Sequence, residues 1–217
     1  MMPLGQALVA LCALSVSIPS AALAQSTPTE LWPELDVHWR TSPRFRTVLE
    51  VAMQTEREAD KHEAYVGLYE DLLRLPAGYA RVGFRYGFST RDASFRESRA
   101  VGEFVFRPWA TETLRLLNRT RGELRWVNDE YSYRVRDRLH LQRVPSDSSG
   151  RAWAPYGTFE LYFDSRFDAI AKLGARVGTE LRIVGPASID LYVARQHDLR
   201  PSEQRVNVLG LTTKLSY

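Results

Sequence analysis

The residues with the most regular chemical pattern are arginines and glutamates placed two apart along two neighbouring segments. They are Arg119, Arg121, Glu123 and Arg125, followed by Arg134, Arg136 and Arg138. Side chains two residues apart share one face of a β-strand. If the two segments pair, that face either neutralises itself through cross-strand ion pairs or remains electropositive and attracts anions.

Other chemistry is weakly represented. The histidines, His38, His62, His140 and His197, show no metal-ligand spacing, and the single cysteine, Cys12, lies near the N-terminus. Hydrolysis of a lipid needs a nucleophile in contact with an oriented base, and His140 has no serine two residues away. We therefore expect no metal, no cofactor and no catalytic residues.

The segments that must position the charged residues alternate between apolar and polar side chains. Residues 79–89 illustrate the pattern, with Val82 and Phe84 on one side and Arg81 and Arg85 on the other. Such strict alternation is typical of β-strands with two different faces. The sequence therefore predicts an all-β protein.

The number and length of these segments indicate a barrel. Eleven can be counted by eye, one of them irregular near residues 63–75. Most span about 9 to 14 residues, which suits membrane strands of about 9–11 residues better than globular strands of about 5–6. Because bacterial single-chain barrels have an even number of strands, we predict an antiparallel up-and-down transmembrane β-barrel of about twelve strands, with ten as the alternative.

Short turns are expected at 41–44, 76–78, 107–111 and 184–187. Longer connections are expected at the other end, near 56–62, 90–95, 127–131 and 197–203.

The N-terminal residues predict export. Met1 to Ala24 carry no charged side chain, and the apolar run from Ala7 to Val16 is too short to span a bilayer as a helix. Ala22-Leu23-Ala24 fits the small-x-small pattern of a signal peptidase site. We predict a signal peptide at residues 1–24, cleaved after Ala24, and an outer-membrane barrel at residues 25–217.

The last predicted strand ends on an aromatic residue. Its alternating outer positions include Leu209, Leu211, Leu215 and Tyr217. In outer-membrane barrels the last strand closes the wall, and aromatic residues lie in girdles at the membrane interface. We expect these four residues to form a C-terminal signal for the outer-membrane barrel assembly machinery.

The charge distribution excludes other classes. The chain has 29 basic and 26 acidic residues, which are interleaved rather than clustered, and a net charge of +3. Proteins that bind nucleic acid gather basic residues on one face, so we expect no nucleic-acid partner. No later apolar run is long enough for a transmembrane helix, and a membrane protein without one must be a closed barrel.

Several stretches also carry a family resemblance. They are Leu35 to Arg46, Phe95 to Phe106, Asn118 to Arg125, Arg134 to Leu141, Tyr156 to Phe163 and Val206 to Tyr217. Together they span nearly all of the chain after the leader and resemble an uncharacterised Gram-negative outer-membrane barrel family, the domain of unknown function twenty-four ninety. The resemblance implies an architecture and a location, and it brings no known activity.

We expect charged side chains to line the interior. The candidates are Glu97, Arg99, Glu103, Arg119, Arg121, Glu123, Arg125, Arg134, Arg136, Arg138 and Glu160, and Asp190 is a further possible partner for the arginines. A twelve-stranded barrel is only modestly wider than one that side chains fill completely. We therefore favour a salt-bridged plug over an open, anion-favouring pore.

The sequence thus predicts a monomeric outer-membrane protein in contact with lipids, either structural or a narrow channel. The alternatives are a lipid-modifying enzyme and a soluble periplasmic barrel that binds a ligand in an apolar cavity.

Overall fold

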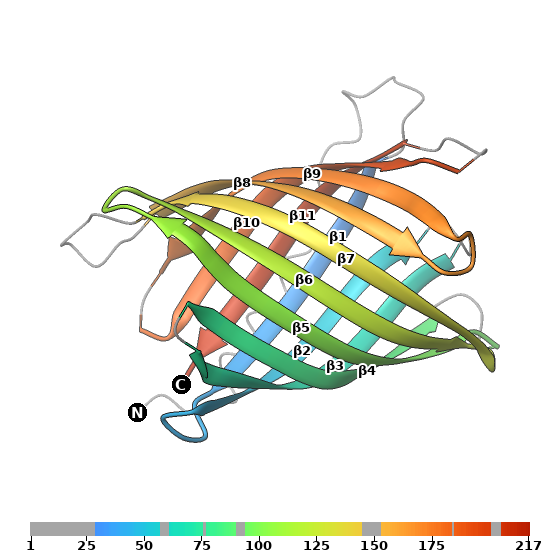
Figure 1. Cartoon of the computed structure of the whole chain (residues 1–217), viewed down its shortest axis with the longest axis horizontal. Helices are drawn as coiled ribbons and strands as arrows, with labels where there is room; N and C mark the ends of the chain where they lie inside the picture. The colour runs from blue at the N-terminus through green and yellow to red at the C-terminus, as the bar shows by residue number, and fades with distance from the viewer. Residues whose placement is uncertain are drawn as a thin grey trace.

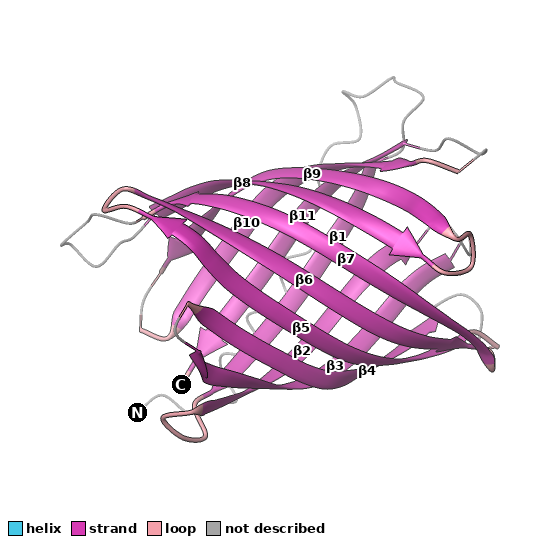
Figure 2. Ribbon diagram, in the orientation of Figure 1, coloured by secondary structure: helices cyan, strands magenta, loops and turns pink. Residues whose placement is uncertain are grey.

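The protein is a closed β-barrel. The computed structural model describes residues 29–56, 61–75, 77–89, 94–144, 153–183, 185–200 and 205–217. The predicted signal peptide at residues 1–24 lies outside the described residues. Strands make up the wall on every side (Figures 1 and 2). Within the described ranges no helix is long and apolar enough to cross a membrane.

Eleven strands form the wall, and each follows the previous one around the barrel. They are β1 (Thr29–Trp39), β2 (Phe45–Glu56), β3 (Lys61–Leu75), β4 (Gly78–Ser89), β5 (Arg96–Ala110), β6 (Leu114–Val127), β7 (Glu130–Arg143), β8 (Trp153–Asp164), β9 (Ala169–Arg182), β10 (Ala187–Asp198) and β11 (Arg205–Ser216).

The prediction of twelve strands, with ten as the alternative, is wrong. Neighbouring strands along the chain pair in antiparallel fashion, but β1 pairs with β11 in parallel, from Thr29 opposite Asn207 to His38 opposite Ser216. In an up-and-down barrel with an odd number of strands, the first and last strands must point the same way. The rule of even numbers presumes antiparallel closure, and here β1 closes the wall in parallel instead.

The alternation in the sequence sorts side chains between the outside and the inside of the barrel. On β4, Val82 and Phe84 point outward and are 63% and 50% exposed, whereas Arg85 points inward and is 4% exposed. The other strands follow the same rule, because successive side chains of a strand face opposite sides. The polar face therefore lies in the lumen and the apolar face forms the outer surface.

One predicted turn lies a few residues from its expected place. We expected a turn at residues 107–111, but β5 continues to Ala110 through a register shift between Phe106 and Trp109. Pro108 sits in this irregularity, where a residue without an N–H group is tolerated. The chain then reverses between Ala110 and Leu114, where the Thr111 hydroxyl accepts a hydrogen bond from the Leu114 N–H at 3.0 Å.

A predicted long connection, near residues 127–131, is a tight turn. Asn128 and Asp129 have φ angles of 48° and 71°, as in a two-residue type I′ hairpin. The Asn128 side-chain oxygen accepts a hydrogen bond from the Arg96 N–H at 2.9 Å. This contact attaches the turn to the start of β5.

Inward-facing glycines make room for aromatic rings that lie against the wall. Tyr192 on β10 lies between Gly178 and Gly210 on its two neighbouring strands. A Cβ atom built on Gly210 would come within 1.8 Å of the Tyr192 ring. Gly210 is therefore required for the position of Tyr192 beside the closing seam.

We predict that Gly210→Ala lowers the free energy of unfolding by about 1–3 kcal/mol, because overpacking forces neighbouring side chains from their rotamers. Urea unfolding of the folded protein, followed by tryptophan fluorescence, measures the change. Gly102→Ala is the matched control, since a Cβ atom there would meet no atom within 4 Å. Equal effects of the two substitutions would contradict this account of Tyr192 packing.

Candidate functional site: the charged lumen

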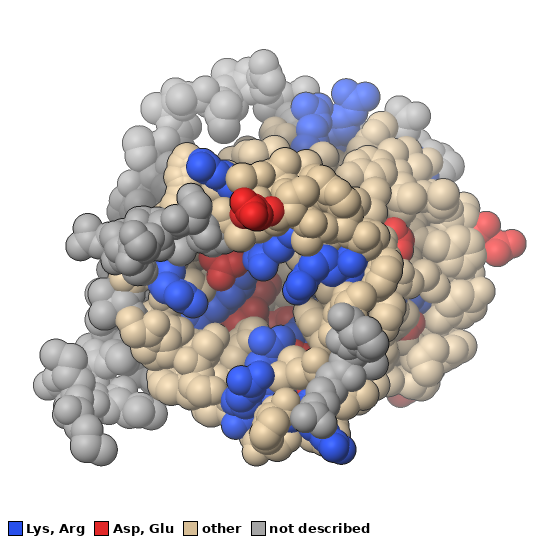
Figure 3. All heavy atoms as spheres, turned by 60° about the vertical axis from the view of Figure 1, so that its left-hand side comes forward, with Lys and Arg blue, Asp and Glu red and all other residues tan. Residues whose placement is uncertain are grey.

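The structure places all the predicted lumen-lining residues on the inner wall of β5 to β8. Their side chains point into the barrel and are mostly buried, as Glu123, 1% exposed, illustrates. Figure 3, a view toward one end, shows basic side chains around a hollow with acidic side chains deeper inside. The charged residues therefore form the filling of the barrel.

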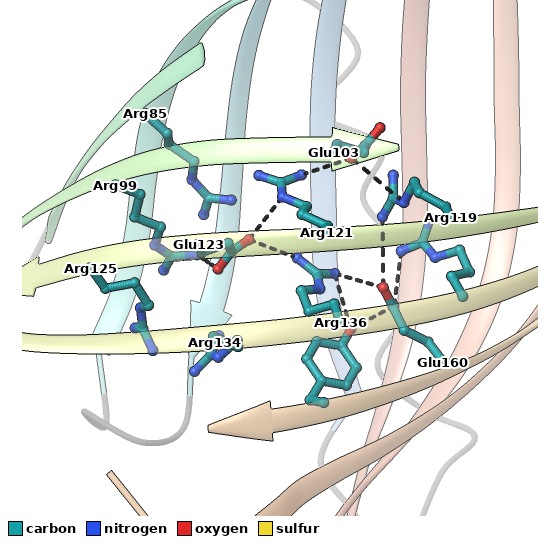
Figure 4. Close-up of polar contacts among 12 residues, drawn as sticks. Arg85, Arg99, Glu103, Arg119, Arg121, Glu123, Arg125, Arg134, Arg136 and Glu160 are labelled. Carbon is teal, nitrogen blue, oxygen red and sulfur yellow. Dashed lines mark hydrogen bonds and ion pairs between the residues drawn. The ribbon is translucent and has the colours of Figure 1, made fainter. Parts of the chain in front are cut away.

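Glu123 is the first of two carboxylates that each join several arginines. Arg121 and Arg136 lie directly opposite each other on β6 and β7. Their like charges are bridged by one oxygen of Glu123, at 2.9 Å from Arg121 Nε and 3.4 Å from Arg136 Nη1. Arg99 approaches the other oxygen at 3.5 Å. Figure 4 shows Glu123 among these guanidinium groups.

Glu160 on β8 is the second such carboxylate. It lies 2.9 Å from Arg138 Nη2, 3.1 Å from Arg136 Nη2 and 3.6 Å from Arg119 Nη2 (Figure 4). The Tyr162 hydroxyl donates a hydrogen bond to Glu160 at 2.7 Å. Arg136 thus links Glu160 to Glu123, and the ion pairs form one continuous network across β5 to β8.

Glu103 is bound more loosely than the other two carboxylates. It lies 3.7 Å from Arg119 Nε and 3.8 Å from Arg121 Nη1. Neither of its buried oxygens has a hydrogen-bond partner among the described residues. The lumen is therefore packed less tightly around Glu103 than around Glu123.

Several residues of the network were missed by the sequence analysis. Asp71 on β3 is fully buried and accepts from Arg81 Nε at 2.5 Å and from Arg46 Nε at 2.9 Å. Asp164, at the end of β8, accepts from Arg134 at 3.0 Å. Arg81 could have been found, because it precedes the outward-facing Val82 on the same strand and must face inward. Asp71 lies on the irregular segment 63–75, where the alternation did not show which side chains face the lumen.

A second part of the lumen is acidic. Carboxylate oxygens of Glu34 and Asp36 on β1 and Glu50 on β2 all lie within 4.8 Å of one another. Among the residues that the structure describes, no basic side chain lies within 4 Å of Glu34 or Glu50, and Glu50 accepts a hydrogen bond from the Tyr69 hydroxyl at 3.4 Å. Since β1 and β2 lie across the barrel from β6 and β7, the lumen has an acidic wall facing a basic one.

A cavity of about 130 Å³ remains between these walls. Ligand pockets for drug-sized molecules measure roughly 300–1,000 Å³, so this space suits only water or a small ion. Its lining residues include Arg85, Arg121, Arg136, Glu34 and Glu50. Among the described residues, charged and aromatic side chains thus fill much of the lumen and leave a small polar cavity.

Comparison with known proteins identifies the family but not an activity. Residues 29–207 match the family model described as "Protein of unknown function (DUF2490)". The chain belongs to the DUF2490 family. No curated protein and no solved structure matches it. What the DUF2490 barrel does must therefore be argued from its geometry.

The outer surface of the DUF2490 barrel is apolar and has aromatic residues near both ends. One group lies at the end where β11 stops and includes Trp39, Phe45, Trp109, Trp153 and Tyr217. The other lies at the opposite end and includes Phe88, Trp126, Tyr131 and Phe167. Two such rings are typical of the interfacial girdles of membrane barrels.

Carboxylates on the otherwise apolar outer face are hydrogen-bonded to the neighbouring strand, as Asp137 shows. Asp137 lies in the middle of β7, between the exposed Val135 and Leu139. Its oxygens accept hydrogen bonds from Thr120 Oγ1 at 2.7 Å and Asn118 Nδ2 at 2.9 Å. Both oxygens are therefore satisfied by neighbours on β6.

Two histidines of the DUF2490 barrel contact an acidic or an aromatic residue. His38 Nε2 is 3.8 Å from Asp36, and the His140 ring stacks on Tyr156 with centroids 4.8 Å apart. The side chain of His62 lies outside the described residues. In the described part of the chain no hydroxyl group hydrogen-bonds a histidine. The absence of an enzymatic activity, a metal or a cofactor remains a prediction.

We predict that Glu123→Gln lowers the free energy of unfolding by about 3–5 kcal/mol, because it leaves buried guanidinium groups without their shared counter-charge. Urea unfolding measures the effect. Glu112→Gln, at an exposed turn position, is the control for removal of one negative charge. If the two variants are equally stable, Glu123 does not hold the network together.

Proposed function

We propose that this protein is an outer-membrane β-barrel whose lumen is closed by a salt-bridged plug. Its role is structural, or that of a narrow channel that favours anions. The observation that carries the proposal is the distribution of side chains, with apolar groups outside and ionised groups inside. Monomeric soluble proteins rarely expose a contiguous apolar surface larger than a few hundred Å², whereas hydrocarbon tails cover such a surface at no cost.

The aromatic residues near both ends support the same proposal. Tryptophan and tyrosine favour the boundary between hydrocarbon and water, because their rings are apolar and carry one polar group. Strands of 11 to 15 residues, such as β1 and β5, are long enough to cross the hydrocarbon layer when tilted. Both the length of the strands and the residues on their outer face therefore suit a barrel that spans a membrane.

The content of the lumen favours membrane insertion over a soluble ligand carrier. A carrier for an apolar molecule requires a cavity lined by apolar side chains. The cavity here is lined mainly by arginines, glutamates and tyrosines. An apolar ligand would have to displace ion pairs in order to bind.

The proposal includes three expectations about partners. Membrane lipids contact the outer face, and the protein is a monomer. Leu209 and Leu211 lie on the outer face of β11 together with Leu215, and Tyr217 follows them. We propose that these residues are read by the outer-membrane barrel assembly machinery.

We predict that the native protein fractionates with the outer membrane and requires detergent for extraction. An unheated sample should migrate faster on a gel than a boiled one, because a closed barrel resists denaturation by detergent. Purification from the periplasm without detergent would contradict the proposal.

Because the lumen is narrow, we predict that only a small ionic current passes through the barrel. In planar bilayers we expect low single-channel conductance with a preference for anions, since rings of arginine favour anions in pores. Neutralising both Arg121→Gln and Arg136→Gln should remove the preference. Arg44→Gln, at an exposed turn position, should not. Large non-selective conductance of the native protein would show that the ion pairs do not fill the lumen.

A further inference from the structure

Several arginines that line the lumen cavity have a buried N–H group without a hydrogen-bond partner. These groups include Nε of Arg85, Nη2 of Arg121, Nε of Arg136 and Nε of Arg138, each of which is buried and finds no acceptor among the described residues. All four arginines line the cavity of about 130 Å³. A buried donor that is left without an acceptor costs about 1–3 kcal/mol, and more if it is charged. The surface of the cavity that these arginines line is itself predominantly polar.

Two of these arginines are almost completely out of solvent. Arg85 and Arg121 are 4% and 5% exposed. The Arg85 guanidinium lies over the Tyr65 ring at 3.1 Å from its centroid, and its nearest carboxylate contact is Glu63 at 3.6 Å. In Figure 4 both Arg85 and Arg121 extend into the interior toward the region around Glu123. The guanidinium groups of both arginines thus lie inside the barrel, away from solvent.

The electrostatics of the cavity favour an anion. Most of the carboxylates of the network, such as Glu97 and Glu160, are engaged by arginines and do not line the cavity. Arg176, another lining residue, contacts the Tyr192 ring at 3.9 Å and has no carboxylate within 4 Å in the described part of the chain. The carboxylates that do line the cavity, Glu34 and Glu50, belong to the opposite wall.

We propose that this cavity is a binding site for a small oxyanion of the size of phosphate or sulfate, held by Arg85, Arg121 and Arg136. Planar guanidinium groups donate paired hydrogen bonds to oxyanions and bind them more strongly than neutral donors do. The volume excludes nucleotides and lipids. The site deepens the proposed function and rests on it, because it names the ion that the filled lumen would hold or admit.

Isothermal titration of the detergent-folded protein with inorganic phosphate, in chloride buffer of constant ionic strength, tests the site. The native protein should bind one phosphate saturably. Arg121→Gln and Arg85→Gln should each weaken binding by about tenfold or more, the loss expected from one charge-assisted hydrogen bond. Arg182→Gln, at the exposed end of β9 and away from the cavity, should bind as the native protein does. Repeating the titration with sulfate distinguishes a general oxyanion site from one that requires phosphate.

Gel mobility of the same unheated samples separates this proposal from the proposed function. Absence of saturable binding to a barrel that still shows heat-modifiable mobility would overturn the oxyanion site alone. Unchanged binding in both arginine variants would do the same. If Arg121→Gln does not fold, phosphate binding by Arg85→Gln still tests the site. Arg85→Gln should fold, because the ion pair that it removes is a long one, 3.6 Å from Glu63.

Discussion

Charge neutralisation inside a closed wall is the constraint on which this structure depends. An arginine in the lumen cannot leave, because the strands on either side of it are hydrogen-bonded and the outer surface is apolar. Most of these arginines therefore pair with a carboxylate within the barrel, and Arg176 lies against an aromatic ring instead. Glu123 and Glu160 meet this need by serving several arginines each, and Arg136 contacts both. The central residues are therefore stable only as a group.

The wall and its filling depend on each other. Parallel pairing of β1 with β11 closes the barrel and sets the acidic wall of Glu34 and Glu50 opposite the arginines of β6 and β7. With antiparallel closure and one further strand, these groups would lie farther apart. The small cavity is a consequence of this arrangement, because arginine side chains reach inward from one side and the shorter glutamates do not fill the remaining space. The hydrogen-bonded Asp137 shows that the outer face obeys the same rule, since an outward carboxylate is accompanied by its own donors.

Much of the fold could be predicted from local pattern. Alternation with period two gives the face of each side chain wherever it is strict, as in β4 and β6, and it gave the eleven segments directly. The prediction failed where a general rule about even strand numbers replaced that count. It also failed at Pro108, since a bulge that extends a strand past a proline depends on the neighbouring strand.

The network was predictable in composition but not in its contacts. The ladder of Arg121 and Arg136 was visible, because their segments are neighbours in the sequence and charged residues recur at every second position in both. The acidic wall and the cavity could not be predicted in this way. Residues on β1 and β6 face each other only after all the strands between them have paired and the barrel has closed. Asp71 was hidden by the irregularity of its own segment.

The central claim is that lipid covers the outer face while the ionised groups fill the interior. The only cysteine is Cys12, which lies in the predicted leader, so single cysteines can be introduced after it for spin labels. The most direct measurement compares labels at Leu139, on the outer face, and at Thr212, on the inner face, in lipid vesicles. We predict that the Leu139 label is relaxed strongly by oxygen, which dissolves in hydrocarbon, and weakly by a water-soluble nickel complex, while the Thr212 label is shielded from oxygen. Strong relaxation of the Leu139 label by the nickel complex would contradict the account.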